Sequence, residues 1–261
     1  MVLTILGLLI VVLGLVGIFH RTQKQDVSFS SKEYFYNQEV RTDQNSFRKI
    51  VSYVKNQFAL VVNTEKNDKI KVPVSFKRQK HPLTCEAAAL AMALNYRKIS
   101  VTEDKLLQEL NFDTKDPKTL DNIWGDPDNG FVGNVNGSVF SGTGYGVYDK
   151  PIKDVAEIYR DAYVIQKGSL SFILGEVDKG NPVIVWGLLP RTQTINWTTL
   201  DGKDIKVQSG EHARIVMGYV GDVTNPSKII LMDPIYGKIR MSTEKFLADW
   251  QKMENRAVVI F

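Results

Sequence analysis

The chain has 261 residues, of which 43% are hydrophobic and 24% are charged. These values are ordinary for a globular protein and exclude collagen, a largely disordered chain and a multi-span membrane protein. A single cysteine excludes an internal disulfide framework and a cysteine-rich zinc module. We therefore expect a folded domain with one free thiol, and the reactivity of that thiol decides the function.

The net charge of +4 belongs to the N-terminal part of the chain. Residues 20–72 hold 10 Lys and Arg against 6 Asp and Glu, whereas residues 73–261 hold 23 of each kind. Because this larger part has no net charge, it has no bulk field that would attract nucleic acid. We expect no nucleic-acid partner.

An uncharged apolar segment, Val2 to Phe19, lies at the start of the sequence. Its 18 residues would span about 27 Å as a helix, near the lower limit for a hydrocarbon core. A cleaved signal peptide would have a basic residue before the apolar segment, and this sequence has none there. Residues 1–20 are therefore predicted to form a transmembrane anchor, with cleavage and secretion as the alternative. Arg21 and Lys24 follow the segment, and the positive-inside tendency alone would leave the domain in the cytoplasm.

Residues 21–71 are predicted to form a juxtamembrane linker that contains an amphipathic helix. The linker is polar and of mixed charge up to about residue 44. Apolar residues then recur at helical spacing, which predicts a helix that packs on the domain. These residues are Phe47, Ile50, Val51, Val54, Phe58 and Val61.

Residues 72–261 are predicted to form one α+β domain whose first half is mainly helical. Alternation over Lys71–Phe76 predicts a strand, and the Ala-rich run Cys85–Tyr96 predicts a helix with Thr84 as its N-cap. Further helices are expected over about 102–110, 151–163 and 169–180. A glycine-rich loop, residues 113–150, separates the first two helices from the others and is expected to be functional. Its aromatic residues are interpreted as core, with a cleft wall as the alternative: Trp124, Phe131, Tyr145 and Tyr148.

The second half of the domain is mainly strands. This order, helices before strands, predicts helices packed on an antiparallel sheet. The predicted elements are strands at 182–189, 212–220, 228–232, 238–241 and 257–261, a hairpin at 195–207, and a helix at 243–253.

Cys85 is predicted at the N-terminus of its helix. Unpaired backbone N–H groups and the helix dipole there favour a thiolate, so we expect a lowered thiol pKa. The alternative is a small buried hydrophobic residue, because free cysteines are among the most buried residue types.

A base for this thiol is predicted among the later strands. His212 begins one strand and Asp233 ends the next, so an antiparallel pair would place them side by side. The carboxylate could then orient the imidazole, although a structural histidine and a turn-forming Asp-Pro remain alternatives. Gln79, before the Cys85 helix, could donate to an oxyanion together with the Cys85 N–H. A metal site that includes His81 has no recognisable ligand spacing, so we expect no metal and no cofactor.

Five segments of the chain are typical of one peptidase family. They are CEAAALAMALNY at 85–96, GDPDNGFVG at 125–133, GYGVYDKPI at 144–152, EHARIVMGY at 211–219 and LMDPIYG at 231–237. They resemble the stand-alone branch of the bacteriocin-processing, double-glycine leader peptidases of Gram-positive bacteria, in the papain-like cysteine peptidase clan. The resemblance implies a papain-like fold over roughly residues 72–261. Exporter-type members carry a multi-span transporter and an ATPase, which this sequence lacks, so double-glycine leader cleavage is not carried over.

The resemblance also implies the roles of individual residues. Cys85 would be the nucleophile, His212 the general base and acid, and Asp233 the orienting carboxylate, with Gln79 in the oxyanion hole. Stand-alone members are exported or anchored at the cell surface, which favours a domain outside the cytoplasmic membrane.

We expect cleavage of a peptide or amide bond in a peptide or protein substrate through an acyl-enzyme. A catalytically silent, surface-anchored peptide-binding module is the alternative function. Transfer of the acyl group to an amine is a third hypothesis.

Overall fold

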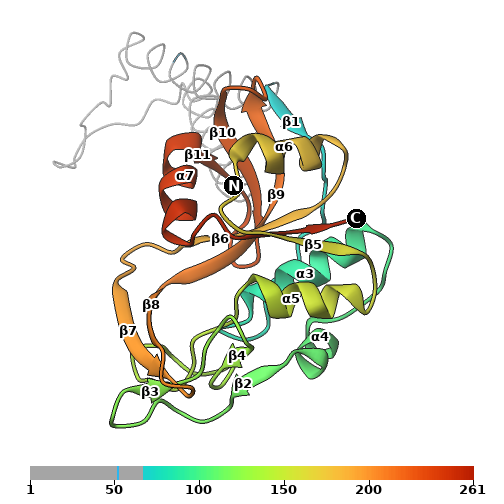
Figure 1. The fold of residues 1–261 in the computed structure, drawn as a ribbon. Coiled ribbons are helices and arrows are strands. Elements are labelled where there is room, and N and C mark those ends of the chain that lie inside the picture. Colours follow the sequence, from blue (N-terminus) through green and yellow to red (C-terminus); the bar gives the residue numbers. More distant parts are fainter. Residues whose placement is uncertain (1–51, 53–66) are drawn as a thin grey trace, which may run out of the picture. The chain divides into compact units, whose positions relative to one another are not determined.

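The structure is a computed structural model that describes Ser52 and residues 67–261 (Figure 1). The chain divides into two units, residues 1–54 and 55–261, and every helix and strand described below belongs to the second unit. The predicted anchor at 1–20 and, apart from Ser52, the predicted amphipathic helix lie outside the described residues. No helix among the described residues is long and apolar enough to cross a bilayer.

An antiparallel sheet forms the centre of the second unit. Its strands follow the order β11-β10-β9-β6-β12-β5. The long strand β9 also pairs with β1, where Gly218 lies so close to Lys69 that a Cβ atom would meet the Lys69 carbonyl oxygen at 2.0 Å. The bounds are β1 Asp68–Ile70, β5 Ala162–Ile165, β6 Val183–Leu188, β9 Glu211–Gly221, β10 Pro226–Asp233, β11 Gly237–Ser242 and β12 Ala257–Ile260.

Five helices lie against this sheet or against one another. Helix α3 contacts β9 and β6, α5 contacts α3, β5 and β12, and α4 contacts α3. Helix α6 contacts β9 and β6, and α7 contacts β6, β10 and β11 (Figure 1). The predicted α+β class is therefore correct. The bounds are α3 Cys85–Tyr96, α4 Glu103–Glu109, α5 Asp149–Glu157, α6 Leu170–Asp178 and α7 Thr243–Lys252.

Residues 113–150, predicted as a loop, contain short strands and a packed aromatic cluster. Strand β2 pairs in parallel with β4, and β3 pairs in parallel with β7 of the β7–β8 hairpin. Trp124 lies 5.2 Å from Trp197, ring centre to ring centre, and Tyr145 lies 5.3 Å from the same tryptophan. The interpretation of these aromatic residues as core is correct. The bounds are β2 Phe112–Thr114, β3 Ile123–Trp124, β4 Phe131–Val132, β7 Thr194–Thr199 and β8 Asp204–Gln208.

Two predicted elements differ from the structure. The strand expected at 71–76 is absent, because Pro73 has no N–H to donate to a neighbouring strand. The strand in this part of the chain is β1, which lies before the expected one and ends at Ile70. The helix expected over 151–163 ends at Glu157, and β5 follows directly. β5 was missed because its four residues are too few to show a period.

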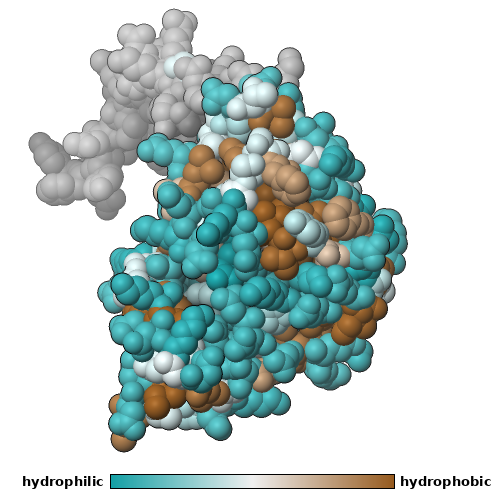
Figure 2. All heavy atoms as spheres, viewed as in Figure 1, coloured by the Kyte–Doolittle hydropathy of each residue, from teal (hydrophilic) through white to brown (hydrophobic). Residues whose placement is uncertain are grey.

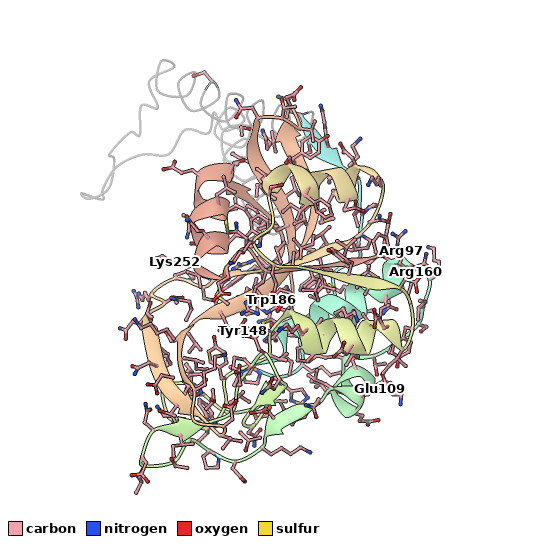
Figure 3. All side chains as sticks on the ribbon, in the orientation of Figure 1. Arg97, Glu109, Tyr148, Arg160, Trp186 and Lys252 are labelled. Atoms are coloured by element: carbon pink, nitrogen blue, oxygen red, sulfur yellow. The ribbon has the colours of Figure 1, made fainter. Side chains whose placement is uncertain are left out.

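The tryptophan side chains fill the interior, and each indole N–H donates to a backbone carbonyl. Trp186 donates to Val147 at 3.0 Å, which places it beside Tyr148 in the middle of the domain (Figure 3). The face in Figure 2 is mostly hydrophilic, with apolar residues in separate small patches. Among the described residues, many large apolar side chains are buried in one cluster, as expected for a single core.

A buried ionic contact joins the C-terminal strand to the glycine-rich segment. Arg256 is 5% exposed, donates to Asp149 at 2.7 Å and to Asp128 at 3.1 Å, and lies 4.3 Å from the Tyr148 ring centre. Asp149 is fully buried. Removing the guanidinium would leave that carboxylate without its charge partner.

We therefore expect Arg256→Ala to lower the free energy of unfolding by about 3–5 kcal/mol. Urea unfolding followed by circular dichroism measures the loss. Lys252→Ala, at the exposed end of α7 (Figure 3), is the control and should change stability by less than about 0.5 kcal/mol. A loss below about 1 kcal/mol for Arg256→Ala would contradict this assignment.

Candidate active site

The first residue of α3, Cys85, is held against the central sheet. The residue is 4% exposed, and its sulfur accepts a hydrogen bond from the Ala213 N–H of β9 at 3.3 Å. Thr84 occupies the N-cap position, as predicted, but its hydroxyl donates to Glu103 and does not cap the helix. The N-terminus of α3 is thus fixed by contacts with neighbouring elements.

His212, the residue before Ala213, is paired with a carboxylate. Its Nε2 lies 3.0 Å from Asp233 Oδ2 at the end of β10, as the antiparallel strand order predicts. The Arg214 Nε donates to the same oxygen at 2.7 Å. Because an ionised carboxylate only accepts, Nε2 carries the ring proton, and Nδ1 keeps a lone pair that can accept another proton.

The Asp233 carboxylate accepts hydrogen bonds both from the turn that follows it and from His212. Burial opposes its ionisation, but His212, the Ile235 N–H and Arg214 together hold the pKa of this carboxyl below its usual range. Its Oδ1 accepts the N–H groups of Ile235 and Tyr236, which is the turn role that the Asp-Pro sequence suggested. Burial lowers the pKa of His212, with a partial offset from Asp233, so the imidazole is neutral at pH 7.

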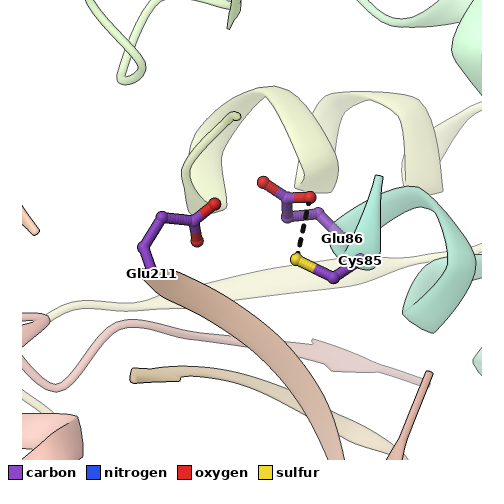
Figure 4. Close-up of side chains that lie close together, drawn as sticks. All are labelled: Cys85, Glu86 and Glu211. Carbon is purple, nitrogen blue, oxygen red and sulfur yellow. Dashed lines mark hydrogen bonds between the residues drawn. The ribbon is translucent and has the colours of Figure 1, made fainter. Parts of the chain in front are cut away.

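The carboxyl groups of two glutamates lie near the thiol (Figure 4). The Cys85 thiol donates to Glu86 Oε2 at 3.2 Å, and Glu86 Oε1 accepts the Val147 N–H at 2.8 Å. Glu211, which precedes His212, has its carboxyl group next to these atoms. Burial and the neighbouring Glu86 raise the pKa of Glu211 strongly, and burial also raises the pKa of Glu86.

The expectation of a lowered thiol pKa is wrong for this structure. Burial, then the charges of Glu86 and Glu211, raise the pKa of Cys85 well above its usual value. The Ala213 N–H acts in the opposite direction but is outweighed. The thiol is therefore protonated here, and its hydrogen bond goes to Glu86 and not to the imidazole.

Gln79 and His81 lie in the loop before α3. The Gln79 N–H donates to the Pro234 carbonyl, which places the loop beside the end of β10. Its side-chain amide donates to His81 O at 2.8 Å and to Pro82 O at 3.0 Å, so both amide hydrogens are engaged within the loop. His81 pairs with Asn136 at 2.9 Å and takes no part in the thiol cluster.

Three residues of this site were not predicted from the sequence. Glu86 and Glu211 stand next to Cys85 and His212 in the chain, and both lie inside quoted segments. Arg214 could have been found from strand alternation, because residues two apart lie on one face of a strand. No sequence signal showed that the two glutamates would meet, since they are 125 positions apart and their contact depends on the packing of α3 on β9.

The raised thiol pKa predicts slow alkylation of Cys85. In metal-free buffer near pH 7, iodoacetamide should react more slowly than with a free peptide cysteine, and the rate should keep rising above pH 9, because only the thiolate reacts. Glu86→Gln removes a negative neighbour and should lower the thiol pKa, with a rate increase of about tenfold per pKa unit. Glu157→Gln, which changes an exposed glutamate at the end of α5, is the control. An unchanged rate in Glu86→Gln would show that this carboxylate does not act on the thiol.

Comparisons with known proteins place the chain in a family. The model of the Peptidase_C39 like family matches residues 69–258. The uncharacterized protein YvpB of Bacillus subtilis is 34% identical over 184 residues, which are 67% of this chain and 68% of YvpB.

Solved structures are also similar to the chain. A candidate C39-like peptidase from Bacillus anthracis is 27% identical, with a TM-score of 0.64 over 74% of this chain and 97% of that one. The peptidase domain of Streptococcus ComA, a bifunctional ABC transporter, is 16% identical, with a TM-score of 0.43 over 72% of this chain and 98% of the ComA domain. The chain, with the α+β fold of the C39-like, papain-like peptidases, belongs to the Peptidase_C39 like family.

Proposed function

We propose that the protein is a cysteine peptidase in which Cys85 is the nucleophile and His212 is the general base. The observation that carries this proposal is that the Cys85 sulfur accepts the N–H of Ala213, the residue that follows His212 in the chain, while His212 Nε2 is paired with Asp233. Nucleophile, base and orienting carboxylate are the three groups that acyl transfer by a thiol requires. Family membership supports the same reaction class.

The proposed reaction begins with a turn of the thiol from Glu86 toward His212. His212 Nδ1 takes the proton of the thiol, and the thiolate attacks the carbonyl carbon of the substrate to form a carbon–sulfur bond. His212 then gives the proton to the leaving amine as the carbon–nitrogen bond breaks. A water molecule, deprotonated by the same nitrogen, cleaves the thioester and restores the thiol.

Stabilisation of the oxyanion is assigned to the start of α3. The Cys85 N–H lies in the first turn, where helix N–H groups have no acceptor within the helix. Gln79 would be the second donor, which requires its amide to leave the His81 and Pro82 carbonyls. Asp233 orients the imidazole and does not itself exchange a proton.

One observation favours the alternative function, a peptide-binding module without turnover. The raised pKa of Cys85 leaves little thiolate at neutral pH in this arrangement. In that case peptides would bind equally well to the wild type and to a variant without the thiol, and neither would release products.

Incubation of the full chain with a peptide library, followed by mass spectrometry, tests the peptidase proposal. We expect Cys85→Ala and His212→Gln to lower turnover by at least about 10³-fold. His81→Gln is the matched control, because this histidine lies at the surface with Asn136, and it should retain wild-type turnover.

Persistent turnover in Cys85→Ala would overturn the assignment of the nucleophile. An equal loss in His81→Gln and His212→Gln would overturn the special role of His212. Peptide binding without products in the wild type would support the binding module.

A further inference from the structure

We propose that Cys85, Glu86 and Glu211 form a binding site for a thiophilic divalent cation such as Zn²⁺. The Cys85 sulfur and one oxygen of each carboxylate all lie within 4.8 Å of one another (Figure 4). The site is a departure from the sequence expectation of no metal. It does not depend on the proposed peptidase activity, although both would use the same sulfur.

The Glu211 carboxyl group is the observation that points to a ligand. Glu211 is 9% exposed, and its Oε2 is buried without a hydrogen-bond partner. The acid group beside it is Glu86, which would carry the same charge. Two buried carboxyl groups side by side are costly as charges unless a proton or a cation balances them, and the Oε2 atom of Glu211 is free to accept such a cation.

The backbone around the cluster leaves room over Gly146. A Cβ atom on Gly146 would lie 2.4 Å from Glu211 Oε1 and 2.8 Å from Glu86 Oε1, so the two carboxyl groups converge over this glycine. Its φ of 146° is also a conformation that other residues rarely adopt. Glycine at this position therefore leaves the space in which the two carboxyl groups come together.

The donor set selects the class of ion. One sulfur and two oxygens suit Zn²⁺, whereas Ca²⁺ and Mg²⁺ prefer oxygen ligands alone. Tetrahedral Zn²⁺ places ligand atoms about 3.4–3.6 Å apart. Cys85 Sγ and Glu86 Oε2 are 3.2 Å apart, and all three ligand atoms lie within 4.8 Å of one another, so they are close to this spacing.

Binding is an exchange of protons for the cation. The S–H bond of Cys85 breaks, a metal–sulfur bond forms, and the thiol proton and the carboxyl proton of Glu211 pass to solvent. No oxidation or reduction takes place. While the ion is bound, the sulfur is blocked from attack on a carbonyl carbon.

Titration of the reduced, chelator-treated full chain with Co²⁺ tests the site. Co²⁺ takes the place of Zn²⁺ and gives a thiolate-to-metal absorption band, which reports only Cys85 because the chain has one cysteine. We expect a band that saturates at one ion per chain and disappears when Zn²⁺ is added. Cys85→Ser should abolish the band, and Glu211→Gln should weaken binding at least about tenfold, a loss of about 1.4 kcal/mol.

Glu157→Gln, an exposed glutamate on α5, is the matched control and should bind Co²⁺ as the wild type does. Circular dichroism checks the folding of each variant, and Glu86→Gln tests the same ligand set if Glu211→Gln does not fold. No thiolate band, or wild-type affinity in a folded Glu211→Gln, would overturn the site and show that the carboxyl pair holds only protons.

The titration requires no substrate, so its outcome separates the two proposals. If Co²⁺ does not bind but turnover depends on Cys85, only the metal-site proposal is overturned. If Co²⁺ binds saturably but the metal-free protein shows no turnover, only the peptidase proposal is overturned.

Discussion

A single backbone amide, the N–H of Ala213, fixes the sulfur of Cys85 on the central sheet at 3.3 Å. This contact brings β9 to the thiol. The two residues before Ala213 in β9 are Glu211, whose carboxyl group lies near the sulfur, and His212, the proposed base. A change in the packing of α3 on β9 would separate all of them at once.

Two groups of ionisable side chains in this site favour different proton positions. Near the end of β10, an ionised Asp233 and Arg214 hold a neutral His212 that can accept a proton. Toward α5, the carboxyl groups of Glu86 and Glu211 favour a protonated sulfur. The helix N-terminus favours the thiolate by about 0.3–1 kcal/mol, up to about 2, whereas an uncompensated buried charge costs several kcal/mol. Burial and the carboxylates therefore outweigh the helix terminus in this arrangement, and the proposed attack requires a rearrangement that turns the sulfur toward the imidazole.

Local patterns in the sequence were enough to predict much of the fold. The Ala-rich helix Cys85–Tyr96, most of the strands after residue 182 and the pairing of His212 with Asp233 follow from propensity, alternation and strand order. Short elements such as β5 could not be predicted, because four residues show no period. The thiol pKa was predicted wrongly because helix position is a local property, whereas the carboxylates that reverse it arrive through tertiary packing. The contact between Glu86 and Glu211 was not predicted for the same reason, because it too depends on tertiary packing.

We propose that Cys85 and the His212–Asp233 pair form one reactive unit. A crystal structure of the full chain treated with a peptidyl aldehyde is the decisive test, because a competent thiolate adds to the aldehyde carbon. We expect a carbon–sulfur bond at Cys85 and His212 Nδ1 within about 3.2 Å of a polar atom of the adduct. An adduct with the imidazole out of hydrogen-bond reach, or a thiol still bound to Glu86 with no adduct, would contradict it.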